Sequence, residues 1–445
     1  MSQLTLAQRD LNVLWHPCTQ MKDHESLPLI PIKHAKGVWL YDYEGRRYLD
    51  AISSWWVNLF GHANPKINAA IKAQLEKLEQ VIFAGFSHEG AIILAERLTQ
   101  LTQLDRCFYA DNGSSAVEVA LKMSFQYWQN KGLTKKIKFA HLENGYHGET
   151  LGALAVGDLG LYKKTFAPLL PEVVRIPVPH PLNKIQGESA KQHATRIFAQ
   201  AEKILNAEHE TICGLIVEPM VQCAGHMNIY DAHYLKLLHA ACDRYHIHLI
   251  ADEIAVGFGR TGKMFACEHA EVTPDFMCLS KGLTGGYLPL SCILTRESIY
   301  QEFYDTYESG KGFLHSHSYT GNPLAVSAAL ATLDIFAEEN SLEKNSHLSA
   351  HLATALENLR DHPHVSNIRQ LGLIAAFDLV DSKGLAYLAN ERRGLKIYQY
   401  AIAHEMLIRP IANTVYFMPP YVITADEISL LLRVTHDAIN DGAKS

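Results

Sequence analysis

The stretch that decides the fold covers residues 248–286 and reads HLIADEIAVGFGRTGKMFACEHAEVTPDFMCLSKGLTGG. Two short apolar runs in it, His248–Ala251 and Phe276–Leu279, have the length and composition of buried strands. Asp252 follows the first run directly, and Lys281 follows the second after one serine. In open α/β sheets, ligands bind beyond the carboxyl ends of the strands, so this arrangement predicts a functional site at that edge.

Short apolar runs of the same kind recur along the central part of the chain. They occupy Arg106–Ala110, Ile137–Ala140, Ile212–Val217 and Leu290–Leu294, and helical or loop segments separate most of them. The predicted helix Ala232–Tyr245 connects two such strands as a right-handed crossover would. Strands that alternate with helices predict an α/β fold with a largely parallel sheet covered by helices.

The two ends of the chain have a different pattern. Residues 31–60 read as short antiparallel strands with a hairpin turn at Glu44-Gly45. Beyond Pro323, amphipathic helices and short alternating strands predict a smaller α+β unit. We therefore divide the chain into an N-terminal segment, 1–60, that packs with the small domain, a large domain, 61–330, and a C-terminal small domain, 331–445.

Composition and charge narrow the range of partners. The 445 residues include 40 Lys and Arg and 47 Asp and Glu, for a net charge of −7 without a basic tail. Neither nucleic acid nor a membrane is therefore expected as a partner, which leaves small molecules. The eight cysteines include no Cys-x-x-Cys pair and the 24 histidines are dispersed, so no metal site is expected. The absence of a recognisable leader and of any run of ~18 apolar residues predicts a cytoplasmic location.

Lys281 and Asp252 each allow two interpretations. A lysine that is partly desolvated at a strand end has a lowered pKa and is suited to form a Schiff base, whereas the alternative is a solvated loop lysine. Asp252 emerges from a buried strand and needs a cation, which a protonated pyridine nitrogen would supply. A helix cap or an ion pair with Arg260 would explain Asp252 equally well.

Gly113 and Ser114 lie between the strand Arg106–Ala110 and the predicted helix Ala116–Asn130. Their backbone N–H groups are expected at a helix N-terminus, which is a favourable site for an anion such as phosphate. Neither a P-loop nor a dinucleotide-binding motif is present. Ordinary helix capping is the alternative interpretation.

Three further side chains are candidates for ligand contacts. Tyr146 lies in a glycine-flanked loop, where its ring either stacks on a planar cofactor or packs in the core. Trp55 and its neighbour Trp56 either line an apolar substrate channel or make a small core contact. Arg409 either binds a substrate carboxylate through two hydrogen bonds or is a surface arginine.

Taken together, these segments resemble the fold-type I, class III aminotransferases. The sequence from Ile250 to Lys263 and the run Ser280-Lys-Gly-Leu-Thr-Gly-Gly carry most of the resemblance. Within the class, the chain resembles the enzymes that convert 8-amino-7-oxononanoate to 7,8-diaminononanoate in biotin biosynthesis. The motifs of this narrower resemblance include Trp15-His-Pro, Ser53-Ser-Trp-Trp, Asn144-Gly-Tyr-His-Gly, Gly321-Asn-Pro-Leu and Met418-Pro-Pro-Tyr.

The resemblance implies pyridoxal 5′-phosphate (PLP) as the cofactor. It also implies a large domain with a mostly parallel seven-stranded sheet and a smaller α+β domain built from both chain ends. Lys281 would form the Schiff base and act as the catalytic residue, and Asp252 would hold the pyridinium nitrogen. The phosphate would lie at Gly113 and Ser114, and Tyr146 would stack on the ring.

The resemblance further implies a homodimer whose sites lie at the interface. Trp55 would contact the aliphatic chain of the keto acid and Arg409 its carboxylate. The loop before Gly321 would reach the neighbouring subunit's site, so that Ser316 contacts substrate and His317 and Ser318 contact the cofactor phosphate.

The expected amino donor is S-adenosyl-L-methionine, because Trp55-Trp56 and His16-Pro17 follow that branch of the family. Two departures keep lysine as the alternative donor. Cys18 stands where adenosylmethionine-using enzymes often have a tyrosine that helps to recognise substrate, and Ser316-His317-Ser318 stands where they commonly have Gly-Pro-Thr.

The sequence is also compatible with three other kinds of protein. The first is a class III enzyme that acts on ornithine, 4-aminobutyrate or a diamine. The second is a protein that binds PLP but has no catalytic activity, and the third is a phosphate-binding protein that does not bind PLP.

Overall fold

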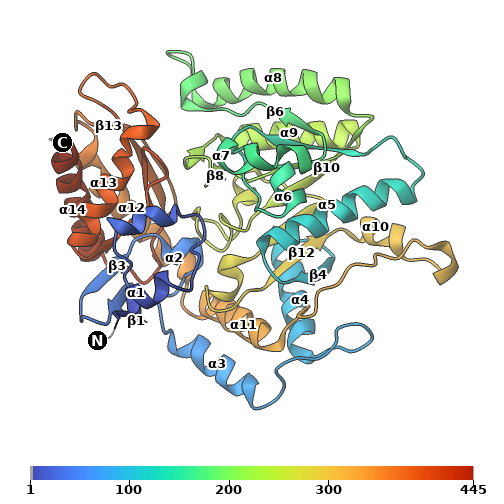
Figure 1. Ribbon diagram of the computed structural model, residues 1–445. Coiled ribbons are helices and arrows are strands. Elements are labelled where there is room, and N and C mark those ends of the chain that lie inside the picture. The colour runs from blue at the N-terminus through green and yellow to red at the C-terminus, as the bar shows by residue number, and fades with distance from the viewer. Residues whose placement is uncertain (1–3, 444–445) are drawn as a thin grey trace.

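The computed structural model describes residues 4–443, and its largest sheet has seven strands in the order β4-β12-β11-β10-β7-β5-β6 (Figure 1). Strand β12 runs antiparallel to both of its neighbours, β4 and β11, and the other adjacent pairs are parallel. The predicted α/β fold with a mostly parallel seven-stranded sheet is confirmed. The strands are β4 (Arg106–Ala110), β5 (Lys138–Leu142), β6 (Val173–Ile176), β7 (Ile212–Val217), β10 (His248–Asp252), β11 (Phe276–Leu279) and β12 (Ser291–Thr295).

Helices cover both faces of this sheet because each strand is apolar on both sides. On β7, Leu215 and Val217 pack with α8 (Ala190–Glu208) and α9 (Ala232–Tyr245). Ile216, between them, faces the other way and packs with α5 (Gly113–Asn130). Successive side chains of a strand point to opposite faces, so a continuous apolar run requires a helix layer on each side.

Two elements of the large sheet region differ from the sequence-based expectation. Strand β6 was missed, because the charged Arg175 interrupts its short apolar run and the strand lies at the sheet edge, paired with β5 alone. Helix α5 begins at Gly113, three residues before the predicted start at Ala116. Asn112 caps it, since its Oδ1 accepts a hydrogen bond from the Ser115 N–H at 3.1 Å.

The two chain ends form a common unit, in which the blue N-terminal and red C-terminal segments lie side by side (Figure 1). A four-stranded sheet joins them, because β15 pairs in parallel with β3. A second sheet and three helices complete the unit. The elements are β1 (Ile32–Lys36), β2 (Trp39–Asp42), β3 (Arg47–Asp50), β15 (Met406–Leu407), β13 (Val365–Leu371), β14 (Ile374–Leu379), β16 (Thr414–Phe417), α12 (Ser341–Leu356), α13 (Arg393–Ala403) and α14 (Ala425–Ala443).

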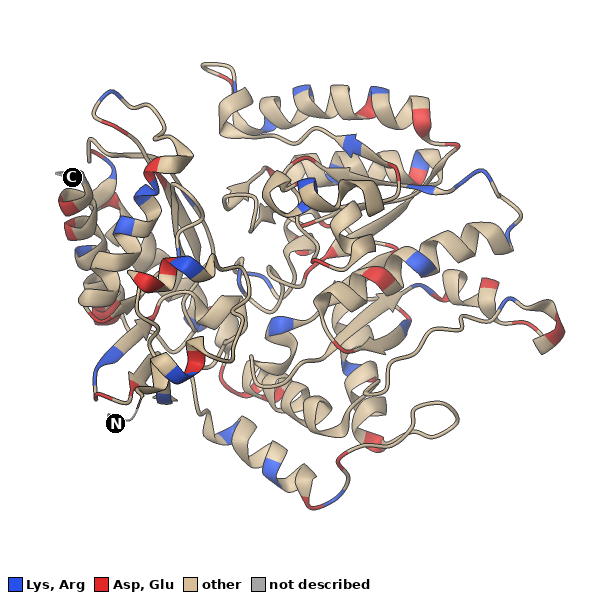
Figure 2. Cartoon of the chain, viewed as in Figure 1, with Lys and Arg blue, Asp and Glu red and all other residues tan. Residues whose placement is uncertain are grey.

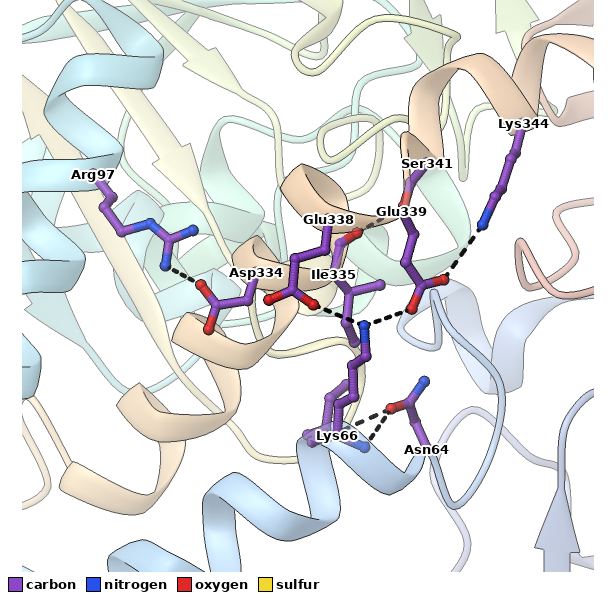
Figure 3. Close-up of polar contacts among 10 residues, drawn as sticks. Asn64, Lys66, Arg97, Asp334, Ile335, Glu338, Glu339, Ser341 and Lys344 are labelled. Atoms are coloured by element: carbon purple, nitrogen blue, oxygen red, sulfur yellow. Dashed lines mark hydrogen bonds and ion pairs between the residues drawn. The ribbon is translucent and has the colours of Figure 1, made fainter.

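The boundaries at residues 60 and 330 stay a prediction, and the second falls within helix α11 (Pro323–Glu338). This helix packs against α3 (Pro65–Leu75) and α4 (Glu89–Thr102). In Figure 3, Lys66 of α3 binds both Glu338 and Glu339 at 2.9 Å. These ion pairs are exposed and each contributes little, so the buried side chains of α11 in the main core hold the helix in place.

Lys and Arg are interspersed with Asp and Glu over the ribbon, without a large region of one sign (Figure 2). The formal net charge of −7 is therefore spread over the molecule. Among residues 4–443, no helix has the length and apolar character needed to cross a membrane.

Candidate functional site

A cavity of about 820 Å³ lies where the carboxyl edge of the large sheet meets the unit formed by the chain ends. Strand-end residues line one side, and residues near 55 and 409–416 line the other. Eight of the predicted site residues lie in its wall: Cys18, Trp55, Gly113, Ser114, Tyr146, Asp252, Lys281 and Arg409. The structure therefore brings together groups that are far apart in the sequence.

Lys281 begins a short 3-10 turn after β11, with a left-handed backbone of φ 46°. Its Nζ lies 4.5 Å from the centroid of the Trp56 ring. Burial lowers the pKa of the Lys281 amine, although Cys223, Asp252 and Glu218 partly oppose this shift. A larger fraction of neutral amine makes the lysine a better nucleophile towards a carbonyl group.

Asp252 ends β10, and its side chain is 6% exposed. Its Oδ2 lies 2.7 Å from Nδ1 of His147, and its Oδ1 accepts the Ile254 N–H at 3.1 Å. The alternative ion pair with Arg260 is not formed. The Arg260 guanidinium instead donates to the backbone carbonyls of Trp56, Asn58 and Pro419.

Sequence reasoning did not single out His147, although it lies in the quoted motif Asn144-Gly-Tyr-His-Gly. Its side chain is fully buried, and a proton on Nδ1 completes the hydrogen bond to the carboxylate of Asp252. Nε2 has no hydrogen-bond partner among the described residues. His147 therefore orients the Asp252 carboxylate from within the protein.

Glu218 follows β7 and fixes the loop that carries Tyr146. Its Oε2 accepts the Tyr146 N–H and its Oε1 accepts the Cys223 N–H, both at 2.9 Å. Burial raises the pKa of the Glu218 carboxyl to about 7, and the nearby Asp252 charge adds to the shift. The Glu218 side chain thus holds the loop through two hydrogen bonds. Because its carboxyl is partly protonated at neutral pH, it places less negative charge beside Asp252 than an ordinary glutamate would.

The first turn of α5 offers an anion site. The N–H groups of Gly113 and Ser114 have no acceptor within the helix, because the first four N–H groups of any helix lack one. Ser114 Oγ accepts the Glu149 N–H at 3.3 Å. Gly148 has φ 122°, and a Cβ there would lie 2.0 Å from Ser114 Oγ, so this close approach of loop and helix requires glycine. The resulting cradle suits a phosphate.

The side chains of Tyr146 and Cys18 both contact the carboxylate of Glu149. The Tyr146 hydroxyl donates to Glu149 Oε1 at 3.1 Å, and Cys18 Sγ lies 3.8 Å from the same oxygen. Burial raises the pKa of Tyr146, and burial followed by the Glu149 charge raises the pKa of the Cys18 thiol. Both groups therefore stay protonated at neutral pH and act as neutral donors.

Arg409 lies over the ring of Trp55, with its guanidinium carbon 4.8 Å from the ring centroid. It donates to the Cys18 carbonyl at 3.3 Å, and no carboxylate of the described residues pairs with it. A guanidinium in a cavity wall without an anionic partner is suited to bind a carboxylate of a ligand.

Trp55 and Trp56 lie on a strained turn, because residues 53–56 all have positive φ, between 46° and 80°. A non-glycine residue in this region costs about 1–3 kcal/mol, so the surroundings must hold the turn. Asp50 does so and is fully buried. Its carboxylate accepts from the Ile52 and Ser54 N–H groups and from Ser54 Oγ, and it pairs with His62 at 2.9 Å.

We expect Asp50→Ala to lower the free energy of unfolding by about 3 kcal/mol or more, because several hydrogen bonds to a buried carboxylate are lost together. The measurement is chemical denaturation. The exposed Asp361→Ala serves as the control and should change stability little. A loss below about 1 kcal/mol in Asp50→Ala would show that other contacts hold the turn.

The structure does not bring Ser316, His317 and Ser318 into the cavity of their own chain. His317 Nε2 lies 3.1 Å from His315 Nε2, and Gln80 donates to the Ser318 carbonyl at 3.0 Å. Ser316 and Ser318 are exposed. Within a single chain these three residues do not line the cavity, and the contacts predicted for them with a neighbouring subunit stay a prediction.

Sequence comparisons identify the family of the chain. A family model described as aminotransferase class-III matches residues 20–439. The chain is 50% identical, over 431 residues, to the adenosylmethionine-8-amino-7-oxononanoate aminotransferase of Helicobacter pylori, and the match covers 96% of this chain and 95% of the relative. The enzyme of the same name from Geobacter sulfurreducens is 40% identical over 433 residues, with 96% of each chain covered.

Solved structures also share the fold. Adenosylmethionine-8-amino-7-oxononanoate aminotransferase from Methanocaldococcus jannaschii superposes with a TM-score of 0.92 at 35% identity and 98% coverage of both chains. An omega transaminase from Pseudomonas jessenii in complex with PMP superposes with a TM-score of 0.94 at 30% identity and 99% coverage of both chains.

Proposed function

This chain belongs to the class III aminotransferases, and from that premise we propose that it transfers an amino group from S-adenosyl-L-methionine to 8-amino-7-oxononanoate. The product would be 7,8-diaminononanoate, an intermediate of biotin biosynthesis. One observation carries the proposal: a buried amine, a buried carboxylate and an unpaired guanidinium line the same cavity, at Lys281, Asp252 and Arg409.

PLP is the cofactor that the cavity residues fit. Lys281 would hold its carbonyl carbon, Asp252 its ring nitrogen, and the first turn of α5 at Gly113 and Ser114 its phosphate. Tyr146 would lie against the ring. When bound, PLP supplies an electron sink that stabilises negative charge at the substrate carbon.

The protein contributes binding, orientation and proton transfer. The carboxylate of Asp252, oriented by His147 Nδ1, favours the protonated form of a ring nitrogen. The Nζ of Lys281 would act as general acid and base, moving a proton between the substrate carbon and the aldehyde carbon of the cofactor within each half-reaction. Its lowered pKa keeps the amine able to accept that proton near neutral pH.

Substrate binding uses the opposite wall of the cavity. Trp55 would contact the aliphatic chain of the keto acid, and Arg409 would bind its carboxylate through two hydrogen bonds. Cys18, beside Arg409 and Glu149, would contribute a neutral thiol where related enzymes often have a phenol.

We further propose a cytoplasmic homodimer in which Ser316 contacts substrate, and His317 and Ser318 contact the cofactor phosphate, in the neighbouring subunit. Supporting this, the loop lies outside its own cavity, and its large apolar side chains Leu314 and Tyr319 are 95% and 64% exposed. Exposed apolar side chains on one loop are typical of a surface that contacts another protein.

We expect Arg409→Gln to raise KM for 8-amino-7-oxononanoate by roughly 10- to 100-fold, because a charged hydrogen bond is worth about 1.5–3 kcal/mol. Steady-state kinetics at saturating donor measure the effect. Arg360→Gln, at an exposed ion pair with Glu357, is the control. An unchanged KM would exclude Arg409 as the carboxylate ligand.

The experiment that tests the proposed function supplies the PLP-loaded protein with 8-amino-7-oxononanoate and, in parallel, adenosylmethionine, lysine, ornithine or 4-aminobutyrate. We expect diamine from adenosylmethionine. If diamine forms with lysine and with no other donor, the proposed acceptor is correct and the donor is lysine instead of adenosylmethionine. No diamine with any donor would refute the proposed acceptor.

A further inference from the structure

Residues 311–318, which we call the strap, belong to the long connection from α10 (Glu297–Tyr300) to α11 (Figure 1). Half-buried and exposed residues alternate along it: Phe313, His315 and His317 are half-buried, whereas Gly312, Leu314, Ser316 and Ser318 are exposed. This alternation is typical of a chain that runs straight along a surface, with successive side chains on opposite sides. One edge of the strap therefore faces its own subunit, and the other faces outward.

Helix α5 holds the strap through one polar face. Lys122, Gln126 and Asn130 follow one another at intervals of four residues, so they lie on the same side of the helix. Gln126 and Asn130 both donate to the Lys311 carbonyl, at 3.0 and 3.3 Å. The Nζ of Lys122 lies 2.9 Å from Nδ1 of His315. Lys122 thus makes the contact of this face that is nearest to the N-terminus of α5, where the phosphate cradle lies.

Lys122, His315 and His317 form a hydrogen-bonded chain, which we call the relay. An ammonium group only donates, so His315 Nδ1 accepts from Lys122 when the His315 ring proton is on Nε2. That proton completes the hydrogen bond to Nε2 of His317, 3.1 Å away, when the His317 proton is on Nδ1. His317 Nδ1 is buried and has no hydrogen-bond partner among the described residues. Asp111 Oδ2, at 3.7 Å, is too distant for a hydrogen bond but favours the same N–H.

The relay requires a neutral imidazole at His315. Burial lowers the pKa of His315, the positive charges of Lys122 and His317 lower it further, and Glu118 partly opposes the shift. A protonated His315 has no lone pair that can accept from Lys122. The relay is therefore fully formed above the ordinary histidine pKa of ~6.5 and is lost as the pH falls through the lowered pKa of His315.

We propose that Lys122 is a positioning residue for the cofactor of the neighbouring subunit: through His315 it fixes the strap and the tautomer in which His317 Nδ1 donates to the cofactor phosphate. This inference rests on the proposed homodimer. A phosphate supplies the acceptor that the buried N–H lacks. Lys122 does not line the catalytic cavity of its own chain, and it lies about 12 Å beyond Ser114 along α5, at 1.5 Å per residue.

The first test measures PLP release from the loaded dimer by ultrafiltration. Lys122→Met and His315→Phe each remove one member of the relay, and phenylalanine keeps a ring against Phe313, on which the His315 ring stacks at 5.9 Å. We expect each variant to raise the Kd of PLP about tenfold at pH 8, the effect of losing a charged hydrogen bond. The double variant should lose no more than either single variant, because both act on one chain of contacts.

The control and the opposite outcomes are equally specific. The exposed Lys135→Met, at an ion pair with Glu210, removes a lysine charge away from the strap and should leave the Kd of PLP unchanged. An unchanged Kd in Lys122→Met would refute the inference. So would effects of Lys122→Met and His315→Phe that add in the double variant, because independent contacts do not form a relay.

A pH series distinguishes the relay from a purely structural role of Lys122. Acidification affects the phosphate and Lys281 in every variant alike, so the ratio of the two Kd values, Lys122→Met over the unsubstituted protein, isolates the relay. The ratio should shrink towards one as the pH falls from 8 to 5, because protonated His315 has then lost its contact with Lys122 in the unsubstituted protein. A ratio that stays constant would contradict the relay.

Hybrid dimers show in which subunit the contact acts. One subunit carries Lys122→Met, its partner is unsubstituted, and tags give the two different masses. The hybrid receives less PLP than it has sites, borohydride then attaches the cofactor to Lys281, and mass spectrometry identifies the labelled subunit. We expect the label mainly on the Lys122→Met subunit, because the intact strap of its partner completes that site. Equal labelling, or label mainly on the unsubstituted subunit, would overturn the inference.

The same measurements separate this inference from the proposed function. Sedimentation that shows a monomer would refute the homodimer and the inference together. A dimer whose PLP affinity does not depend on Lys122 would refute the inference alone. Failure to form diamine from any donor would refute the proposed reaction, and the labelling of hybrid dimers would still decide whether Lys122 acts on the neighbouring site.

Discussion

Replacing Lys281 with alanine is expected to lower kcat by on the order of 10⁴-fold with every donor, the upper range for loss of a general acid and base. Lys281 carries the one lysine amine among the described residues that line the catalytic cavity, so no neighbouring lysine can replace it. Single-turnover rates of the two half-reactions measure the loss. The exposed Lys263→Ala, in the loop after β10, should retain full activity.

Two further readouts separate a chemical role of Lys281 from a structural one. Borohydride should attach the cofactor covalently to the unsubstituted protein and not to Lys281→Ala. Added methylamine should restore part of the rate of the variant, because a small amine can enter the space that the side chain leaves. Turnover of Lys281→Ala at a rate comparable to the unsubstituted protein would refute the assignment.

Asp252→Asn is expected to lower kcat by on the order of 10²- to 10³-fold in both half-reactions. Asparagine keeps the size of the side chain and can still accept the Ile254 N–H, but it removes the negative charge that faces the ring nitrogen. The dissociation constant of PLP should rise as well. Asp243→Asn, at an exposed ion-pair position of α9, is the control.

A modified cofactor decides whether the charge of Asp252 is what matters. PLP that is methylated on its ring nitrogen carries a permanent positive charge and needs no carboxylate to stay cationic. If Asp252 acts through that charge, the methylated cofactor should restore much of the rate of Asp252→Asn. If the rate stays low, the carboxylate acts instead by holding His147 and the loop around it.

The residues at the strand ends were predictable because their chemistry is visible in one local pattern. An apolar run followed by Asp252 or Lys281 indicates both burial and the presence of a reactive group. The same reasoning placed Gly113 and Ser114 at a helix start, although α5 begins three residues earlier than expected, since the cap at Asn112 is a weaker signal than the apolar pattern.

Contacts between distant segments were not predictable in this way. His147 and Asp252 are 105 residues apart, and only the folded sheet brings them to 2.7 Å. The burial of Asp50 under a strained turn likewise depends on the chain ends packing together, as Ser53 Oγ donates to the Met418 carbonyl. Local patterns report a residue's immediate neighbours, whereas these contacts are set by tertiary packing.

The most direct test of the central claim follows the transferred nitrogen. PLP-loaded protein is incubated with 8-amino-7-oxononanoate and adenosylmethionine that carries ¹⁵N in its α-amino group, and the product is analysed by mass spectrometry. The account predicts 7,8-diaminononanoate with one ¹⁵N atom, formed on the order of 10⁴-fold more slowly by Lys281→Ala. Unlabelled diamine, or none at all from the unsubstituted protein, would contradict it.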